Sequence, residues 1–281
     1  MNIAVPDLKS RLLARLQMFS GHNACSSANV PCDGQMFAYC ALQRERIASV
    51  VSDTPIIGIV LRGQKEVWRA DTAEVLTPGT VFAFPRGVPL DIVNVPDMRS
   101  GIYESLVLPI TGLPPGIAPL APARRAQGFA VTLTPDLVEA ICHAATTIAD
   151  RTHGEALRQH RIAEMLTLLA ADPAGRHLLA GDLSERAAWI VAHDPAHPWS
   201  VDELAQKMGV GASTLRRGLT REGKPFRRLL TDVRMHAAQN ALRQGASITE
   251  AAIAAGYVSR AHFNNAYRTY YGHPPRNDRG K

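Results

Sequence analysis

The sequence predicts an α+β protein, with an antiparallel β-barrel and a helix pair in its N-terminal part and an all-α domain in its C-terminal part. Three observations support this fold class. Residues 35–109 contain short apolar runs separated by Gly and Pro turns, residues 134–171 carry two helical patterns, and residues 200–271 contain a pair of helical segments that occurs twice. The chain has 281 residues, of which 46% are hydrophobic and 20% charged, and these values are typical of globular domains and not of a disordered chain.

The first predicted element is an amphipathic helix near the N-terminus, in which Leu8, Leu12, Leu16 and Phe19 share one face. We interpret it as a helix that docks on the following strands and not as a targeting peptide, because it lacks a continuous apolar segment. No apolar run approaches the roughly 18 residues that a membrane helix needs. We therefore expect no membrane contact and a cytoplasmic location.

The four cysteines favour the same compartment. Cys25, Cys32, Cys40 and Cys142 form no C-x-x-C pair and have no companion His at the spacing of a zinc finger. We expect reduced, partly buried thiols, with a disulfide or a redox sensor as the alternative.

Seven short strands are predicted between Phe37 and Leu108, each bounded by residues that favour turns, such as Pro78-Gly79. They cover residues 37–42, 47–51, 56–61, 66–69, 81–84, 92–95 and 102–108. Many short strands at this spacing are typical of an antiparallel barrel or sandwich. The segment 61–87 resembles the cupin-like barrels of sensor domains, and we assign residues 1–130 to a cupin-like β-barrel sensor domain.

A small barrel can enclose one ligand, and catalytic cupins use several histidines to hold a metal ion. The only histidines before residue 150 are His22 and His143, and both lie outside the predicted strands. We therefore expect no metal site, no cofactor and no catalytic residue. Four groups on the predicted barrel could bind a small anionic or aromatic effector: Trp68, Arg69, Arg86 and Tyr103.

Residues 131–180 are expected to form a pair of amphipathic helices that follows a Pro-rich connector. Thr134 is a suitable N-cap with Pro135 at the first helical position, and the second helix covers residues 155–171. The apolar faces must pack either against the barrel or against the same helices of another chain. We favour packing against the barrel, with dimerisation through residues 131–180 as the alternative, and the two contacts can occur together.

An internal repeat organises residues 181–281. Ser200–Val210 aligns with Ser247–Tyr257 at a constant offset, and each copy has a predicted capping box and then a Gly at the helix end. A second helix follows each Gly, over residues 212–222 and about 259–271. A short helix, a turn with Gly and a second helix constitute the helix-turn-helix motif, whose second helix enters the major groove of DNA.

The segment between the copies is predicted to be a linker helix from Pro225 to about Arg243. At about 1.5 Å per residue it is close to the roughly 34 Å of one DNA turn, so one chain could read two successive major-groove segments. Charge supports a nucleic-acid partner. Residues 1–180 carry 16 Lys and Arg and 16 Asp and Glu, while residues 181–281 carry 15 and 9, so the whole excess of +6 lies in the C-terminal part.

The last 100 or so residues resemble AraC/XylS-type transcription regulators. Residues 247–257 and 262–275 match the family signature, and residues 234–242 are similar to its linker helix. The resemblance implies a transcription regulator, an activator, that binds promoter DNA, forms a homodimer and contacts RNA polymerase. It also implies that the N-terminal half is the sensor and dimerisation half.

The resemblance assigns DNA-binding positions to both second helices. They are Ser213, Thr214, Arg216 and Arg217 in the first copy and Arg260, Ala261, His262 and Asn265 in the second. Separately, five basic residues are candidates for contacts to the phosphate backbone: Arg221, Lys224, Arg227, Arg228 and Arg268. Arg is the most common reader of guanine, which favours Arg216 or Arg217 for direct readout. Two positions depart from the family pattern: Asn265 stands where Arg is usual, and Asp278 stands where an aromatic is common. The polar Asp278 puts in doubt how tightly the C-terminus packs.

Several alternatives remain open. The N-terminal half could bind a small effector or a regulatory protein. The chain could be a metal-independent cupin-type enzyme with a DNA-binding tail, or a constitutive DNA-binding protein with an inert barrel.

Overall fold

The computed structural model describes residues 7–19, 36–69, 72–122, 128–150 and 152–280. The chain forms two compact units, Met1–Ala180 and Gly181–Lys281. The N-terminal unit contains the β-structure and the C-terminal unit is all helical, which confirms the α+β fold class.

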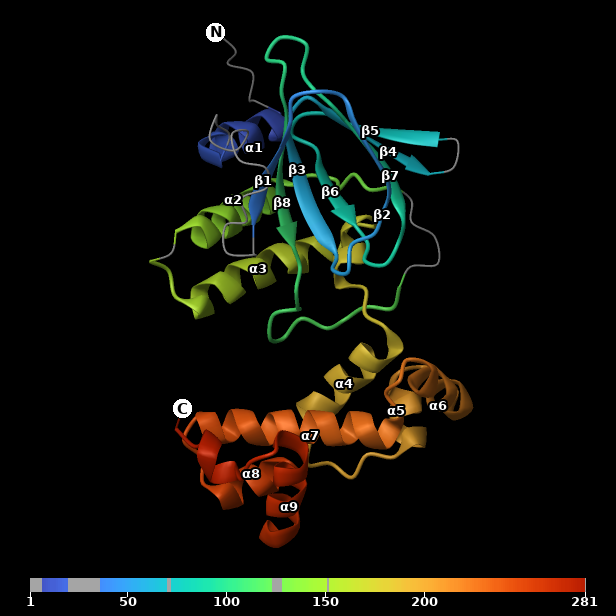
Figure 1. Cartoon of the computed structure of the whole chain (residues 1–281), viewed down its shortest axis with the longest axis vertical. Helices are drawn as coiled ribbons and strands as arrows, with labels where there is room; N and C mark the ends of the chain where they lie inside the picture. The colour runs from blue at the N-terminus through green and yellow to red at the C-terminus, as the bar shows by residue number, and fades with distance from the viewer. Residues whose placement is uncertain (1–6, 20–35, 70–71, 123–127, 151, 281) are drawn as a thin grey trace. The chain divides into compact units, whose positions relative to one another are not determined.

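The N-terminal unit is built from two antiparallel sheets of four strands each (Figure 1). One sheet has the order β1 (Phe37–Ala41), β8 (Tyr103–Pro109), β3 (Ile56–Arg62), β6 (Val81–Phe84). The other has the order β2 (Glu45–Val50), β7 (Leu90–Val95), β4 (Gln64–Arg69), β5 (Thr72–Leu76). The helices are α1 (Leu8–Leu16), α2 (Pro135–Ala149) and α3 (Glu155–Leu169), with short 3-10 turns at Gln17–Phe19 and Gly175–Leu179.

The sheet that contains β3 is buried on both faces. Ile57 and Ile59 point to one face and pack with the helices α1, α2 and α3, which all lie on that side in Figure 1. Val60 and Phe82 point to the other face and pack with residues of the second sheet such as Ile92. This double burial explains why β3 is a continuous apolar run in the sequence instead of an alternating one.

The predicted barrel needs one correction. The described strands form two separate sheets, and no hydrogen-bonded ladder joins them into a closed barrel. The strand β5 was not predicted, because Thr72–Leu76 contains a Glu and an Ala among its five residues and gives no clear alternation.

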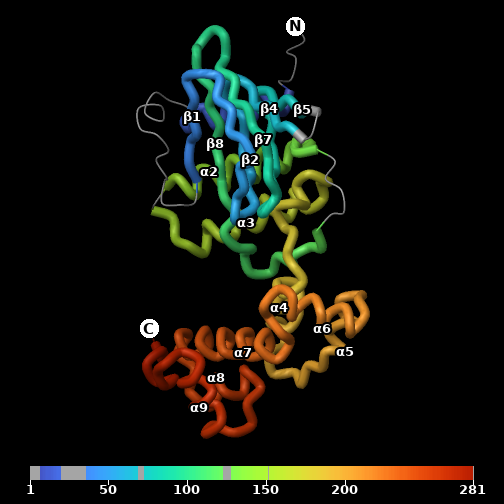
Figure 2. Tube along the Cα trace, turned by 45° about the vertical axis from the view of Figure 1, so that its right-hand side comes forward, coloured from blue at the N-terminus to red at the C-terminus, as the bar shows by residue number. Residues whose placement is uncertain are grey.

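The C-terminal unit contains six α-helices in its described residues. They are α4 (Leu183–His193), α5 (Val201–Lys207), α6 (Ala212–Arg221), α7 (Phe226–Arg243), α8 (Ile248–Ala254) and α9 (Arg260–Tyr271), followed by a 3-10 turn at Pro275–Asp278. The pair α5 and α6 lies near one end of α7, and the pair α8 and α9 near the other (Figures 1 and 2). The helix α4 was not predicted, although its capping box of Asp182 and Glu185 is a readable signal.

Two cysteines lie among the described residues, and they differ. Cys142 is a buried free thiol, and burial raises its pKa. Cys40 in β1 is disulfide-bonded, so the prediction of reduced thiols is wrong at this position. Cys25 and Cys32 lie outside the described residues. None of the helices in the described part of the chain is long and apolar enough to cross a membrane.

One glycine of β3 is required by packing, and this can be tested. A Cβ atom on Gly58 would lie 2.1 Å from Cζ of Phe82, whose ring covers the glycine between the two sheets. We expect Gly58→Ala to destabilise the N-terminal unit by about 1–3 kcal/mol, because the ring must shift within a packed core. Urea denaturation followed by circular dichroism measures the change.

Gly112→Ala is the matched control. A Cβ atom on Gly112 would have no neighbouring atom within 4 Å, and the φ of this glycine is not in the left-handed region. This variant should stay within about 0.5 kcal/mol of the unmodified protein. Equal stability of both variants would contradict the packing role of Gly58.

Candidate nucleic-acid interface

The two helix-turn-helix motifs begin with different caps. In the second motif, Ser247 N donates to Glu250 Oε2 (2.7 Å) and Glu250 N donates to Ser247 Oγ (3.2 Å), so the predicted capping box is complete. In the first, Glu203 N donates to Ser200 Oγ (3.1 Å), but the carboxylate of Glu203 lies 2.9 Å from Nε2 of His197. Only half of the predicted first box therefore forms, since the side chain that should complete it binds an imidazole.

The turns of both motifs use a glycine in the left-handed region. Gly209 has a φ of 66° and Gly256 a φ of 74°, which are conformations that favour glycine. At Gly256 space is also limited, because a Cβ there would lie 2.9 Å from Cα of Ala196. The buried Ala205 and Ala252 allow close helix packing just before each turn.

The helix α6 presents its predicted DNA-binding residues to solvent. Ser213, Thr214, Arg216 and Arg217 are all exposed, whereas Leu215 on the opposite face is fully buried. Gly218 also faces inward, against the side chain of Leu183. The fold thus anchors α6 by one face and leaves a polar, cationic face free.

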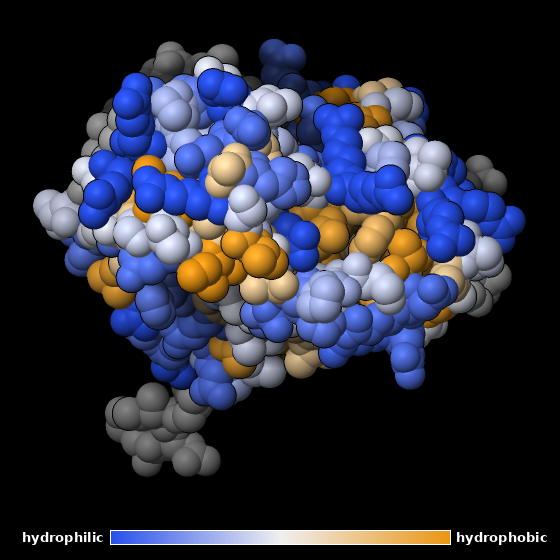
Figure 3. All heavy atoms as spheres, turned by 90° about the horizontal axis from the view of Figure 1, so that it is seen from below, coloured by the Kyte–Doolittle hydropathy of each residue, from blue (hydrophilic) through white to orange (hydrophobic). Residues whose placement is uncertain are grey.

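The cationic groups around α6 have no acidic partner among the described residues. Arg216, Arg217, Arg221 and Lys224 are exposed and form no ion pair with any described residue. Their charge is therefore available to a polyanion, since no carboxylate in the described part of the chain pairs with it. Figure 3 shows one face of the molecule, on which hydrophilic residues predominate and hydrophobic residues gather in separate patches.

The helix α9 has the same arrangement with less positive charge. Its predicted contact residues are all exposed: Arg260, Ala261, His262, Asn265 and Arg268. Ser259 caps the helix by accepting from His262 N (3.4 Å), and Phe263 and Tyr267 form its buried face. The structure therefore places both sets of predicted residues on exposed helix faces of comparable position.

The linker helix α7 joins the two motifs through packing and through one arginine. Leu229 packs with the first motif, and Met235 and Leu242 pack with the second. Arg234 donates from Nε to the carbonyl of Pro195 (2.9 Å) and from Nη2 to that of His197 (3.0 Å). With 18 residues, α7 has a length of about 27 Å.

Asp278 fastens the C-terminus, although the sequence suggested that it would loosen it. Only 4% of Asp278 is exposed. Its Oδ2 accepts from the hydroxyl of Tyr267 (2.6 Å) and from Nε2 of Gln239 (3.2 Å), and it lies 3.6 Å from Nε2 of His273. Burial and this carboxylate raise the pKa of Tyr267. A polar clasp thus replaces the apolar contact that an aromatic would make.

The predicted effector residues lie apart from one another. Trp68 is 39% exposed on β4 and donates to Glu66 Oε2 (3.1 Å), so it lies on the outer face of its sheet. Tyr103 on β8 is fully buried between the sheets. Arg86 is half-buried in the turn after β6, and the side chain of Arg69 lies outside the described part.

Sequence reasoning missed Lys65, which is 6% exposed. A signal was available in β4, because side chains alternate between the faces of a strand. Val67 is apolar and Glu66 is charged, so the side chain of Val67 is expected on the inner face of the sheet. Lys65 is two positions before Val67 and therefore lies on the same face.

The C-terminal unit matches a known protein family. Residues 204–281 match the protein family described as a helix-turn-helix domain. The HTH-type transcriptional regulator YdeO of Escherichia coli strain K12 is 33% identical over 87 residues, which are 31% of this chain and 34% of YdeO. The urease operon transcriptional activator of Escherichia coli is 36% identical over 87 residues, which are 31% of this chain and 29% of that protein.

One solved structure matches a similar share of this chain. It is a transcriptional regulator from Chromobacterium violaceum described as containing an AraC-type DNA-binding domain. It is 26% identical, covers 34% of this chain and 88% of that chain, and has a TM-score of 0.33. The chain spans about a third of the length of the curated relatives it matches.

The clasp of Asp278 can be tested by stability. We expect Asp278→Ala to lower the stability of the C-terminal unit by about 1–3 kcal/mol, because the hydroxyl of Tyr267 would stay buried without its acceptor. Thermal unfolding of the full chain measures this. Arg276→Ala, an exposed change in the same turn, is the control and should leave the midpoint unchanged. Equal midpoints for both variants would show that the clasp contributes nothing.

Proposed function

We propose that this chain, whose C-terminal unit is a helix-turn-helix domain of the AraC type, is a sequence-specific DNA-binding transcription regulator. The match of residues 204–281 to a helix-turn-helix family supports the resemblance to AraC/XylS-type regulators that the sequence indicated. The observation that carries the proposal is the pair of exposed helices α6 and α9, each anchored by a buried apolar face and joined by one continuous helix. Such a pair can occupy two successive segments of the major groove.

Within this function we propose separate roles for the exposed residues. Arg216 and Arg217 read bases, since the arginine fork bonds guanine at O6 and N7. Arg221, Lys224 and Arg268 contact phosphates, which position the protein without reading sequence. Asn265 reads adenine, because an amide can bond its N6 and N7.

We also propose that the protein activates transcription through contact with RNA polymerase and that it works in the cytoplasm. The urease operon activator, one of the matched relatives, is an activator by name. The N-terminal unit is proposed to bind an effector and to have no catalytic role. In its described residues no group of three His, Cys, Asp or Glu is placed to hold a metal ion.

Direct readout is tested by one arginine. We expect Arg217→Ala to weaken binding to the target promoter by about 1–3 kcal/mol and to relax the preference at one base pair, because a bidentate contact to guanine is lost. The target is first found by genome-wide binding of the intact protein, and affinity is then measured by fluorescence anisotropy on promoter DNA and on scrambled DNA.

Two variants serve as comparisons in the same assay. Lys224→Ala should weaken binding to both DNAs alike and lower the salt slope by about one, as expected for a phosphate contact. Arg99→Ala, an exposed change in the N-terminal unit, should alter neither. Unchanged promoter affinity in Arg217→Ala would refute its assignment to base readout.

A homodimer is proposed from the helix pair. The helix α3 buries Met165, Leu166 and Leu169 within its own unit but leaves Leu157 40% exposed. We expect sedimentation velocity to show a dimer for the unmodified chain and a shift to monomer for Leu157→Glu, since a charge at an apolar contact is unfavourable. A dimer that persists in Leu157→Glu would exclude this part of α3 as the contact.

A further inference from the structure

A cavity lies between the two sheets of the N-terminal unit and is almost wholly apolar. Its volume is about 140 Å³. Sixteen residues line it, and most are aliphatic or aromatic, among them Phe37, Ile47, Phe84 and Leu90. An apolar protein cavity of about 150 Å³ is large enough to hold benzene. The cavity therefore fits an apolar body of about the size of one benzene ring.

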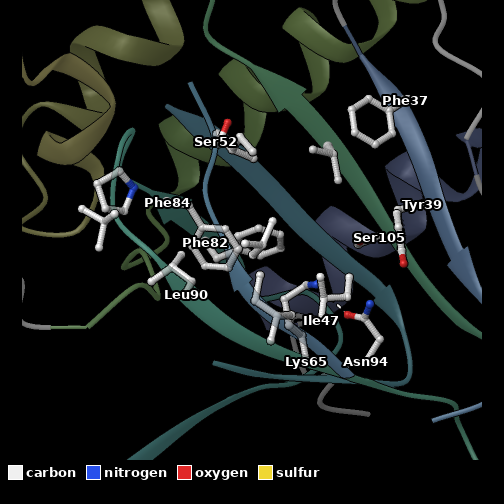
Figure 4. Close-up of a pocket in the computed structure, with 16 residues that line it drawn as sticks. Phe37, Tyr39, Ile47, Ser52, Lys65, Phe82, Phe84, Leu90, Asn94 and Ser105 are labelled. Carbon is white, nitrogen blue, oxygen red and sulfur yellow. Dashed lines mark hydrogen bonds between the residues drawn. The ribbon is translucent and has the colours of Figure 1, made fainter. Parts of the chain in front are cut away.

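One end of the cavity carries a buried cation. Lys65 Nζ donates to Asn94 Oδ1 (2.6 Å), and both side chains lie together in Figure 4, apart from Ser52 and Phe84. Lys65 is 6% exposed and Asn94 is fully buried. An ammonium group has three donors, and this amide is its one hydrogen-bond acceptor among the residues that the structure describes.

The carboxylate of Glu45 does not neutralise this cation directly. Asn94 lies between the two groups, because its Nδ2 donates to Glu45 Oε2 (3.1 Å) while its Oδ1 accepts from Lys65. The same oxygen of Glu45 accepts from the hydroxyl of Tyr39. Within the described ranges Lys65 forms no ion pair, and a buried charge without a partner is strongly unfavourable.

Other groups around Lys65 provide ring faces and two buried hydroxyls without a hydrogen-bond partner among the described residues, those of Tyr103 and Ser105. Its Nζ lies 5.0 Å from the ring centre of Tyr103 and 5.7 Å from that of Phe82. These rings stabilise a cation but accept no ordinary hydrogen bond. Ser105 also lines the cavity and is fully buried, and its Oγ has no hydrogen-bond partner among the residues that the structure describes. Lys65 and Ser105 thus leave donors unused inside an apolar space.

We propose that this cavity binds a small aromatic monocarboxylate, with the carboxylate on Lys65 and Ser105 and the ring among the apolar residues of the two sheets. The inference deepens the effector role proposed above and rests on it. A carboxylate supplies the negative charge and the acceptors that both side chains lack. Ser52, Pro85 and Val88, which line the cavity and are only partly buried or exposed, mark the side on which the ligand enters.

The protonation of Lys65 gives the proposal a measurable signature. Burial lowers the pKa of Lys65 to about 7, although the charge of Glu45 opposes this. The neighbouring hydroxyls of Tyr39 and Tyr103 have raised pKa values and stay neutral over this range. A bound carboxylate favours the protonated amine, so binding above pH 7 takes up a proton and weakens as pH rises.

The test uses the intact chain, with benzoate as the probe and benzamide as its neutral analogue. Titration calorimetry near pH 6.5 should show benzoate binding at least about tenfold tighter than benzamide, because only benzoate can pair with the ammonium. Between about pH 7 and pH 9 the affinity for benzoate should fall by up to about tenfold per pH unit, while that for benzamide stays constant. Equal affinities at pH 6.5, no saturable benzoate binding, or a benzoate affinity independent of pH would overturn the proposal.

Variants locate the contact. Lys65→Met should remove the preference for benzoate over benzamide, and Ser105→Ala should reduce it. Lys9→Met, which changes an exposed lysine bonded to Thr80, should leave both affinities unchanged. If Lys65→Met does not fold by circular dichroism, the pH profile of the unmodified protein decides. A folded Lys65→Met variant that keeps the preference would refute the site.

The affinities for benzoate and benzamide are measured without DNA and do not depend on DNA binding. Promoter affinity of the same preparation without benzoate tests the regulator function alone. Loss of promoter binding with intact benzoate binding would count against the proposed function, and the reverse result would count against the ligand.

Discussion

The continuity of helix α7 is the constraint on which the whole C-terminal unit depends. A continuous helix is stiff over its full length, so the separation of the two motifs packed at its ends is fixed by the length of α7. Leu229 belongs to one apolar cluster and Met235 to the next, and only five residues lie between them along the helix. Arg234 lies between these two residues in α7. It donates to the carbonyl groups of Pro195 and His197, which precede α5, and so holds the start of the first motif next to the second cluster. Recognition geometry is therefore a property of one helix and its packing.

The N-terminal unit differs from the C-terminal unit in that its interior contains a charged side chain, that of Lys65. Packing of Phe82 over Gly58 and of the helices on the far face of the same sheet provides the apolar stabilisation. That stabilisation allows the sheets to keep Lys65 and Ser105 in a region where polar groups are unfavourable. Because the burial of Lys65 is unfavourable for the stability of the fold, a functional role explains this residue better than a structural role does. This unit has no net charge, whereas the C-terminal unit carries +6, so the attraction for a polyanion is confined to the latter.

The parts that could be predicted from sequence are those with local causes. Serine caps, glycines with positive φ and apolar periodicity are encoded within a few residues, so the repeat and the exposed faces of α6 and α9 were readable. Sheet closure depends on which edges pair across the fold, and no local signal specifies that pairing. Asp278 was misjudged because its partners Gln239 and Tyr267 come from other elements. The side chain of Glu203 was misassigned for a similar reason, since His197 competes for it.

The lower charge of α9 is compatible with specific binding because the two motifs are tethered. Once α6 occupies its groove segment, α7 holds α9 within reach of the next, and the second contact becomes intramolecular. The effective concentration is high because α7 is a helix and not a flexible linker, so little conformational freedom is lost when α9 docks. A contact of modest strength then adds measurably to affinity. Asn265 in place of a cation would exchange attraction to phosphate for readout of a base, and the rigid connection is what makes that exchange possible without loss of binding.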